Sequence, residues 1–102
     1  METVLSEKKL KVVAHVLKTV AHPTRIAIIH ALKGNEGLSV SDICAKLGGV
    51  DQSLTSHHLS IMKLKGILGN RRNGRNIYYY LKLQEVIKVI DCVENCTMDF
   101  DL

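Results

Sequence analysis

The sequence predicts a mainly α-helical fold with one small β-hairpin. Apolar residues recur at helical spacing along most of the 102 residues, and the chain has one proline, which argues against a turn-rich all-β fold. A single Asn-Gly pair separates two runs rich in β-formers, which is a strong hairpin signal. With 46% hydrophobic and 24% charged residues, the composition is that of a globular protein, and its length predicts one domain spanning 1–102.

Four helices are expected before the hairpin. Pro23 opens the second of them, because proline fits the first turn of a helix. Ser39 followed by Asp42 resembles a capping box and begins the short third helix. The helical periodicity predicts that the side chains of Ile26 in the second helix and Leu54 in the fourth face the core. The expected boundaries are 6–20, Pro23 to Gly34, 40–47 and 52–65.

The hairpin and a last helix complete the chain. Expected strands over 67–72 and 76–81 flank the turn Asn73-Gly74-Arg75. A final helix is expected over 83–97, with an unusually broad apolar surface. A short helix, a glycine-containing turn, a second helix and a hairpin form the plan of a winged helix-turn-helix, whose second helix enters the major groove of DNA.

The charges are strongly segregated along the chain. From 52 to 82 there are six lysines and arginines and no Asp or Glu, whereas 83–102 carries one lysine and five acids. A basic segment of this kind is typical of a surface that binds a polyanion, because cations near phosphates release counterions. The alternative is an ordinary solvated face.

The predicted fourth helix and hairpin bring together groups that suit duplex DNA. Hydroxyl, amide and imidazole groups can bond to base edges or phosphates, and arginines near the hairpin tip can reach the backbone or the minor groove. Of the adjacent pair His57 and His58, we expect one to face DNA and one the core. The predicted DNA-binding residues are Gln52, Ser53, Thr55, Ser56, His57, Ser60, Lys63, Arg71, Arg72 and Arg75.

These same stretches resemble the ArsR/SmtB family of winged-helix repressors. Residues 20–26 are similar to that family's entry to its second helix, 52–68 to its recognition helix and exit, and 71–79 to its wing. The resemblance covers about 10–95. It implies a DNA-binding transcriptional repressor that is a homodimer and leaves its operator when a small effector binds.

A dimer is also expected on physical grounds. The last helix is apolar over more than one face, and so short a chain has few elements to cover it. Pairing the first and last helices with those of a second copy would bury the excess. The operator should then be an inverted repeat with half-sites about 34 Å apart. The alternative is that the last helix only covers the core of one chain.

The resemblance implies two common metal sites, and this sequence matches neither. Ser39 and Ser41 stand where one site needs thiolates, and a hydroxyl is a poor ligand for a soft metal. The start of the last helix carries Gln84 and Glu85 where the other site needs Asp and His.

Cys92 and Cys96 are the remaining candidates for sensing, since residues four apart share one face of a helix. They could bind a thiophilic metal or metalloid ion, such as arsenite, Zn²⁺, Cd²⁺ or Cu⁺, with a further ligand from elsewhere. They could instead respond to oxidants, or pack as small apolar residues at the dimer seam. Cys44 is expected in the core, and His15, His22 and His30 as partly buried structural residues.

Other functional classes are disfavoured. The sequence has no Gly-rich phosphate loop and no nucleophile elbow, so we expect no enzyme. A winged helix that binds proteins is the main rival from another class, and acids in 52–65 or a neutral hairpin would favour it. No apolar run approaches the roughly 20 residues that cross a bilayer, and we expect a cytoplasmic protein without membrane contact.

Overall fold

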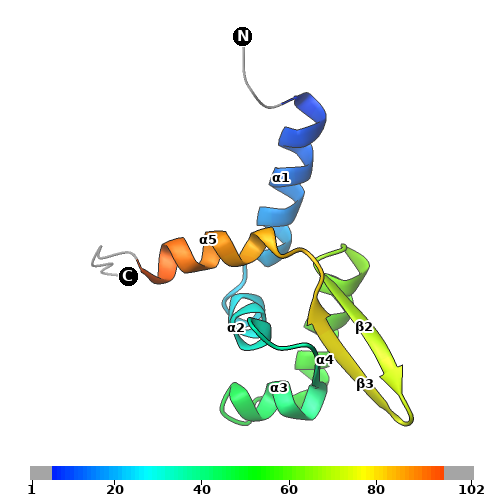
Figure 1. The fold of residues 1–102 in the computed structure, drawn as a ribbon. Helices are drawn as coiled ribbons and strands as arrows, with labels where there is room; N and C mark the ends of the chain where they lie inside the picture. Colours follow the sequence, from blue (N-terminus) through cyan, green and yellow to red (C-terminus); the bar gives the residue numbers. More distant parts are fainter. Residues whose placement is uncertain (1–5, 96–102) are drawn as a thin grey trace.

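The computed structural model describes residues 6–95, and its element order confirms the predicted mainly helical fold with a hairpin (Figure 1). The body contains α2, α3, α4 and the sheet, and both α1 and α5 project from it. The elements are α1 (Glu7–Val20), α2 (Pro23–Leu32), β1 (Leu38–Ser39), α3 (Val40–Lys46), α4 (Gln52–Leu64), β2 (Leu68–Asn73), β3 (Asn76–Leu81) and α5 (Glu85–Glu94).

Side-chain caps explain why the helices begin where the sequence predicts. Ser39 and Asp42 close a complete capping box at α3, each side chain bonding the other residue's backbone N–H at 3.1 Å. His22 caps α2 through Nδ1, which accepts the Thr24 N–H at 3.2 Å, and Pro23 occupies the first helical position. At α4 the Asp51 carboxylate accepts the Leu54 N–H at 2.8 Å. Each cap pairs a backbone donor that the helix itself leaves free.

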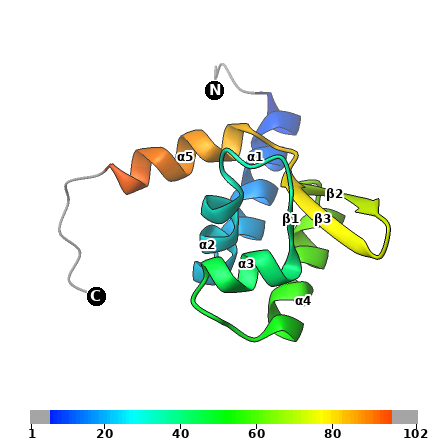
Figure 2. The same cartoon turned by 60° about the horizontal axis from the view of Figure 1, so that its bottom comes forward.

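The sheet has one strand more than predicted. Its order is β1-β3-β2, all antiparallel, and Leu38 and Ser39 of β1 pair with Tyr79 and Tyr78 of β3 (Figure 2). A two-residue strand is too short to produce an alternating pattern in the sequence. It forms because the loop after α2 passes beside the open edge of β3.

The hairpin turn is one residue shorter than the predicted one. Asn73 belongs to β2 and pairs with Asn76, so the loop contains only Gly74 and Arg75. Gly74 has a φ of +66°, while Arg75 is not among the positive-φ residues of the described range, which fits a type II′ turn with glycine first. The strands therefore remain paired up to the tip of the wing.

The core is almost entirely aliphatic and lies where α2, α3, α4 and the sheet meet. Cys44 is buried as predicted. Ile26 was expected to point inward, and this is wrong: it is 42% exposed, because the buried face of α2 is formed by Ile28, Ile29 and Leu32. The other buried hydrophobic residues include Ile43, Leu59, Met62, Ile67, Leu68, Leu81 and Val86.

The boundary of α5 differs from its prediction. The helix starts at Glu85 rather than 83, and its C-cap is Asn95. The predicted end at 97 lies outside the described residues. Across 6–95 no single helix has the length and apolar character needed to cross a bilayer. Taken together, α1 and α2 have that length and composition, but the two helices are bent by 97° at their junction.

Candidate nucleic-acid interface

Helix α4 follows α3 and packs against it, α2 and β2, leaving one long face uncovered (Figure 2). Ser53, His57 and Ser60 are all exposed and lie at helical spacing along this face. Gln52 and Lys63 are exposed beside it, and Ser56 is partly buried. Most of the predicted DNA-binding side chains of this helix are therefore accessible together.

Thr55 is the exception, and its predicted place on the polar side is wrong. Its side chain is 1% exposed, and its hydroxyl donates to the Asp51 carbonyl at 2.8 Å. Thr55 lies one helical turn before His58 and Leu59, both buried, and so shares their inward face. A threonine with its hydroxyl bonded to the preceding turn can occupy a core position, which periodicity alone did not reveal.

Leu54 differs from its prediction in the opposite sense. It was expected in the core with Met62, yet it is 61% exposed, while Met62 is fully buried. Ile61, the third residue assigned inward on this helix, is intermediate. The buried face of α4 is thus rotated toward Thr55 and His58, and a large apolar side chain remains on the accessible side.

A partly buried polar cluster fixes α4 against the first two helices, α1 and α2. Arg25 donates from Nε to Nδ1 of His58 at 3.1 Å and from Nη1 to the Thr19 carbonyl at 2.8 Å. The ring of His22 lies 4.5 Å from that of His58, centroid to centroid. The cluster therefore ties the end of α1 and the start of α2 to the middle of α4.

The environment of His58 in this cluster disfavours the protonated form of its ring. Its pKa is lowered from the ordinary value of 6.5, first by burial and then by the neighbouring charges of His22, Arg25 and His57. Because a guanidinium can only donate, the neutral ring accepts at Nδ1 and carries its proton on Nε2. His57 is exposed and His58 is 7% exposed, which confirms that one faces outward and the other the core.

The other three histidines were expected to be partly buried, and this is wrong, since His15, His22 and His30 are all exposed. His22 caps α2 and packs on His58. His30 Nε2 lies 3.2 Å from Oε1 of Glu94 on α5. The packing of His22 on His58 and the contact of His30 with Glu94 depend on partners distant in sequence, so spacing did not indicate them.

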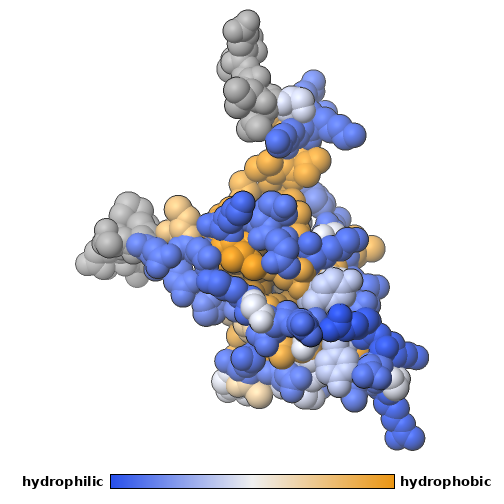
Figure 3. All heavy atoms as spheres, viewed as in Figure 1, coloured by the Kyte–Doolittle hydropathy of each residue, from blue (hydrophilic) through white to orange (hydrophobic). Residues whose placement is uncertain are grey.

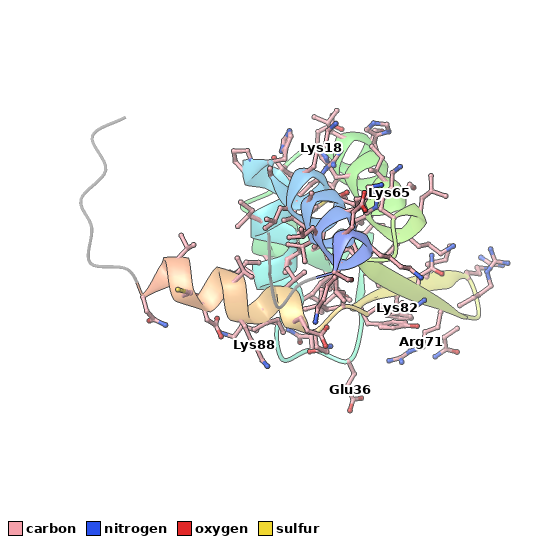
Figure 4. All side chains as sticks on the ribbon, turned by 90° about the horizontal axis from the view of Figure 1, so that it is seen from above. Lys18, Glu36, Lys65, Arg71, Lys82 and Lys88 are labelled. Carbon is pink, nitrogen blue, oxygen red and sulfur yellow. The ribbon has the colours of Figure 1, made fainter. Side chains whose placement is uncertain are left out.

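The three arginines of the hairpin have different environments, although all are exposed. Arg71 donates from Nη2 to the Glu36 carbonyl at 2.8 Å, and its guanidinium carbon lies 5.8 Å from the centre of the Tyr80 ring. Figure 4 shows Arg71 beside the loop that carries Glu36. Within 6–95 no side-chain hydrogen bond or ion pair is formed by Arg72 or Arg75. Arg71 is thus anchored to the protein, whereas Arg72 and Arg75 are available.

A second surface, formed by α1, α2 and α5 and lying away from the wing, is apolar. Figure 3 shows hydrophobic side chains along α1 and where α5 passes below it, and hydrophilic side chains along the wing. An open groove of about 960 Å³ runs between α1, α2 and α5. We call this the α1–α2–α5 groove; its exposed apolar side chains include Leu17 (47%), Ile26 (42%), Val89 (50%) and Val93 (65%).

Polar contacts join α5 to α2 at the rim of this groove. The Lys33 ammonium donates to the Asp91 carboxylate, and this hydrogen bond raises the pKa of Lys33 above its usual value. His30 and Glu94 meet one turn further along α5. The orientation of α5 therefore rests on a few exposed polar contacts as well as on the burial of Val86.

Of the two cysteines predicted to sense an effector, the structure describes only one. Cys92 is exposed on α5, and Cys96 lies outside the described residues. Within 6–95 no group of three His, Cys, Asp or Glu side chains lies close enough to hold a metal ion. The Ser39 hydroxyl is engaged in capping α3, so it does not replace a thiolate there. A metal would need Cys96 or a ligand from a second chain in addition to Cys92.

Comparison with known proteins gives consistent matches. The family model described as "Bacterial regulatory protein, arsR family" matches residues 22–68. The HTH-type transcriptional regulator YgaV of Escherichia coli is 32% identical over 82 residues, which cover 80% of this chain and 82% of that protein. The crystal structure of the transcriptional repressor PagR of Bacillus anthracis has a TM-score of 0.77 at 34% identity, covering 86% of this chain and 99% of that one. The structure of the AntR antimony-specific transcriptional repressor has a TM-score of 0.79 at 26% identity, covering 91% and 83%.

Proposed function

Because this chain belongs to the ArsR family of bacterial DNA-binding transcriptional repressors, we propose that it acts as a homodimer that places α4 of each protomer in the major groove of an inverted-repeat operator. The observation that carries this proposal is the exposed face of α4, where Ser53, His57 and Ser60 lie together in a segment without acids. Its relatives are transcriptional regulators rather than enzymes.

The side chains of α4 suit base edges and phosphates. Hydroxyls and imidazoles can bond to base edges or phosphates, and Gln52 at the first turn offers an amide to adenine. Gln52 Nε2 lies 3.4 Å from the Ser41 hydroxyl of α3, so this side chain is already oriented near the N-terminal end of the helix. Lys63 adds a cation beside the same face. Ser56 is less accessible and is proposed as a phosphate or base contact at the margin of the face.

The wing supplies the cations. Arg72 and Arg75 are proposed to contact the DNA backbone or the adjacent minor groove, since they are exposed and free of protein partners within 6–95. Arg71 contributes charge, but its bond to Glu36 and its position over Tyr80 give it a second, structural task. The wing is therefore expected to contribute affinity that depends on salt and little on sequence.

The α1–α2–α5 groove supports the dimer. Apolar patches of this kind mark interfaces, and a two-fold axis would place the same groove of a second chain against it. Two copies of α4 would then face the same side of a duplex about one helical turn apart. An operator lies where the chromosome is, so a cytoplasmic location is part of this proposal.

Release by an effector acting at Cys92 and Cys96 is the second part of the proposal. Cys92 is exposed on α5, a helix of the proposed dimer face, so a change there can alter how the two copies of α4 are spaced. AntR is named as antimony-specific, which makes trivalent metalloids the first effectors to test. Oxidants and a purely structural role are the other two possibilities for these cysteines.

The test of DNA binding is an in vitro selection from a random duplex library with the full chain. We expect enrichment of an inverted repeat with half-site centres about 10 base pairs apart, bound by two chains per duplex. Enrichment of a single half-site bound by one chain would contradict the dimer. No enriched sequence together with capture of a protein ligand would favour the protein-binding winged helix.

The test of sensing uses the selected duplex and the variants Cys92→Ser and Cys96→Ser. Antimonite, arsenite, Zn²⁺, Cd²⁺, Cu⁺ and a polysulfide are each added to the complex, and release is followed by fluorescence anisotropy. We expect an active effector to lose its action in both variants. Unchanged release would remove both thiols from the mechanism.

A further inference from the structure

We propose that Leu54 reads the C5-methyl group of a thymine in each half-site of the operator. The inference deepens the proposed function and rests on it, since it requires that α4 lies in the major groove. Leu54 is the third residue of α4 and is 61% exposed.

Within the described part of the chain, Leu54 remains largely uncovered. The residues of α4 that face the core are Thr55, His58, Leu59 and Met62, and Leu54 is not among the residues that line the α1–α2–α5 groove. A second copy docked on that groove would therefore leave Leu54 exposed. Leu54 instead lies next to Ser53 and one turn before His57, both on the accessible face of the helix.

The chemistry of the major groove leaves one base partner for such a side chain. Leucine has no hydrogen-bond donor or acceptor, and the one apolar group that the four natural bases present in this groove is the methyl group of thymine. The surroundings admit DNA, because no acid occurs from 52 to 82. The N-terminal residues of a recognition helix are the ones that contact base edges, and Leu54 is among them.

The chain offers a matched control on the same helix. Leu64 is even more exposed, at 81%, but it is the last residue of α4. Ten residues at 1.5 Å per residue place it about 15 Å further along the helix axis than Leu54. Exposure alone would favour Leu64, whereas the proposed docking favours Leu54.

The test replaces thymine by deoxyuridine, one position at a time, in the duplex enriched from the random library by the wild-type chain. This substitution removes a single methyl group and leaves every hydrogen bond of the base in place. We expect about three- to fivefold weaker binding at one thymine per half-site, because the burial of one methyl-sized group against Leu54 is lost. Leu64→Ala should retain this discrimination, and Leu54→Ala should bind the thymine and uracil duplexes equally.

Two further variants separate a local effect from misfolding. Leu54→Met keeps an apolar side chain of similar length and should retain the discrimination, whereas Leu54→Ser should lose it. Because Leu54 is exposed, both variants should melt within about 2 °C of the wild type.

Three results would overturn the inference: no thymine whose methyl group matters, discrimination that survives in Leu54→Ala, or discrimination lost in Leu64→Ala instead. If the wild-type chain selects no duplex at all, the proposed function fails and the inference with it, which is a different outcome from selection without methyl discrimination.

Discussion

The α4–wing surface and the α1–α2–α5 groove differ in how complete they are within one chain. The first is polar, and its geometry is set internally: Arg25 and His58 hold α4, and Arg71 holds the wing to the loop before β1. The second is apolar and exposes Leu17 and Val93 to solvent. The difference teaches that one chain by itself sets the geometry of the proposed DNA-binding surface, while the spacing of two such surfaces would require the proposed dimer.

The largest effect is expected from a charge placed in the groove. Leu17→Asp should convert the dimer to a monomer and weaken operator binding by about 100-fold or more, because the linkage of two binding modules is lost. Light scattering after size exclusion gives the mass, and anisotropy gives the affinity. The control Leu64→Asp, on α4, should remain dimeric; a dimeric Leu17→Asp would place the interface elsewhere.

A large loss of stability is expected when the polar cluster around Arg25 and His58 is broken. Arg25→Ala leaves the Thr19 carbonyl and His58 Nδ1 without their donor and should lower the free energy of unfolding by about 1–3 kcal/mol. Urea denaturation measures it. Arg72→Ala should leave this free energy within about 0.5 kcal/mol of the wild type while weakening DNA binding. Equal stability of the two variants would show that the cluster does not hold α4.

Acid should destabilise the α4 side of the molecule through His58. In the folded chain the pKa of His58 lies below 6.5. At a pH between this lowered pKa and 6.5, the unfolded chain therefore binds more protons than the folded chain. The free energy of unfolding should therefore fall as the pH decreases from 6.5 through the lowered pKa. His58→Gln, which does not titrate, should show a flatter pH profile. His57→Gln removes only the smallest of the causes that lower the pKa of His58, so this variant should still lose stability in acid.

The smallest effects should separate the arginines of the wing. Arg75→Ala should weaken binding to all duplexes and reduce the slope of log affinity against log salt by about 1, because one phosphate contact is lost. Arg71→Ala should also lower the melting temperature, since it removes the bond to the Glu36 carbonyl. If the two variants change stability equally, Arg71 is not a structural link.

Much of the fold was predictable because its signals are local. The capping residues Ser39 and Asp42, Pro23 at the start of α2 and Gly74 in the hairpin act on their own backbone neighbours. The predicted helix and strand boundaries therefore agree with the structure within one or two residues, the end of α5 excepted. Strand β1 was missed because its two residues become a strand only by pairing with Tyr78 and Tyr79.

The site residues were predicted less evenly, since chemistry is visible in a sequence and exposure is not. Ser53, His57 and Ser60 are accessible, as their polarity indicated. Thr55 is buried and Leu54 is exposed, the reverse of the prediction. The buried face of α4 is set by where α2 and the sheet lie and not by the polarity of each residue.

The amino-acid sequence by itself determined the order of the helices and the hairpin, the acid-free basic segment and the resemblance to a repressor family, because these depend on residues close to one another along the chain. The tertiary structure alone decided which face of α4 is accessible, that Arg71 is anchored while Arg72 and Arg75 are available, and that the pKa of His58 is lowered where it packs beside His22 and Arg25. Such properties arise from contacts across 33 or more residues of separation, as in the Arg25–His58 and Arg71–Glu36 bonds, and no local pattern encodes them.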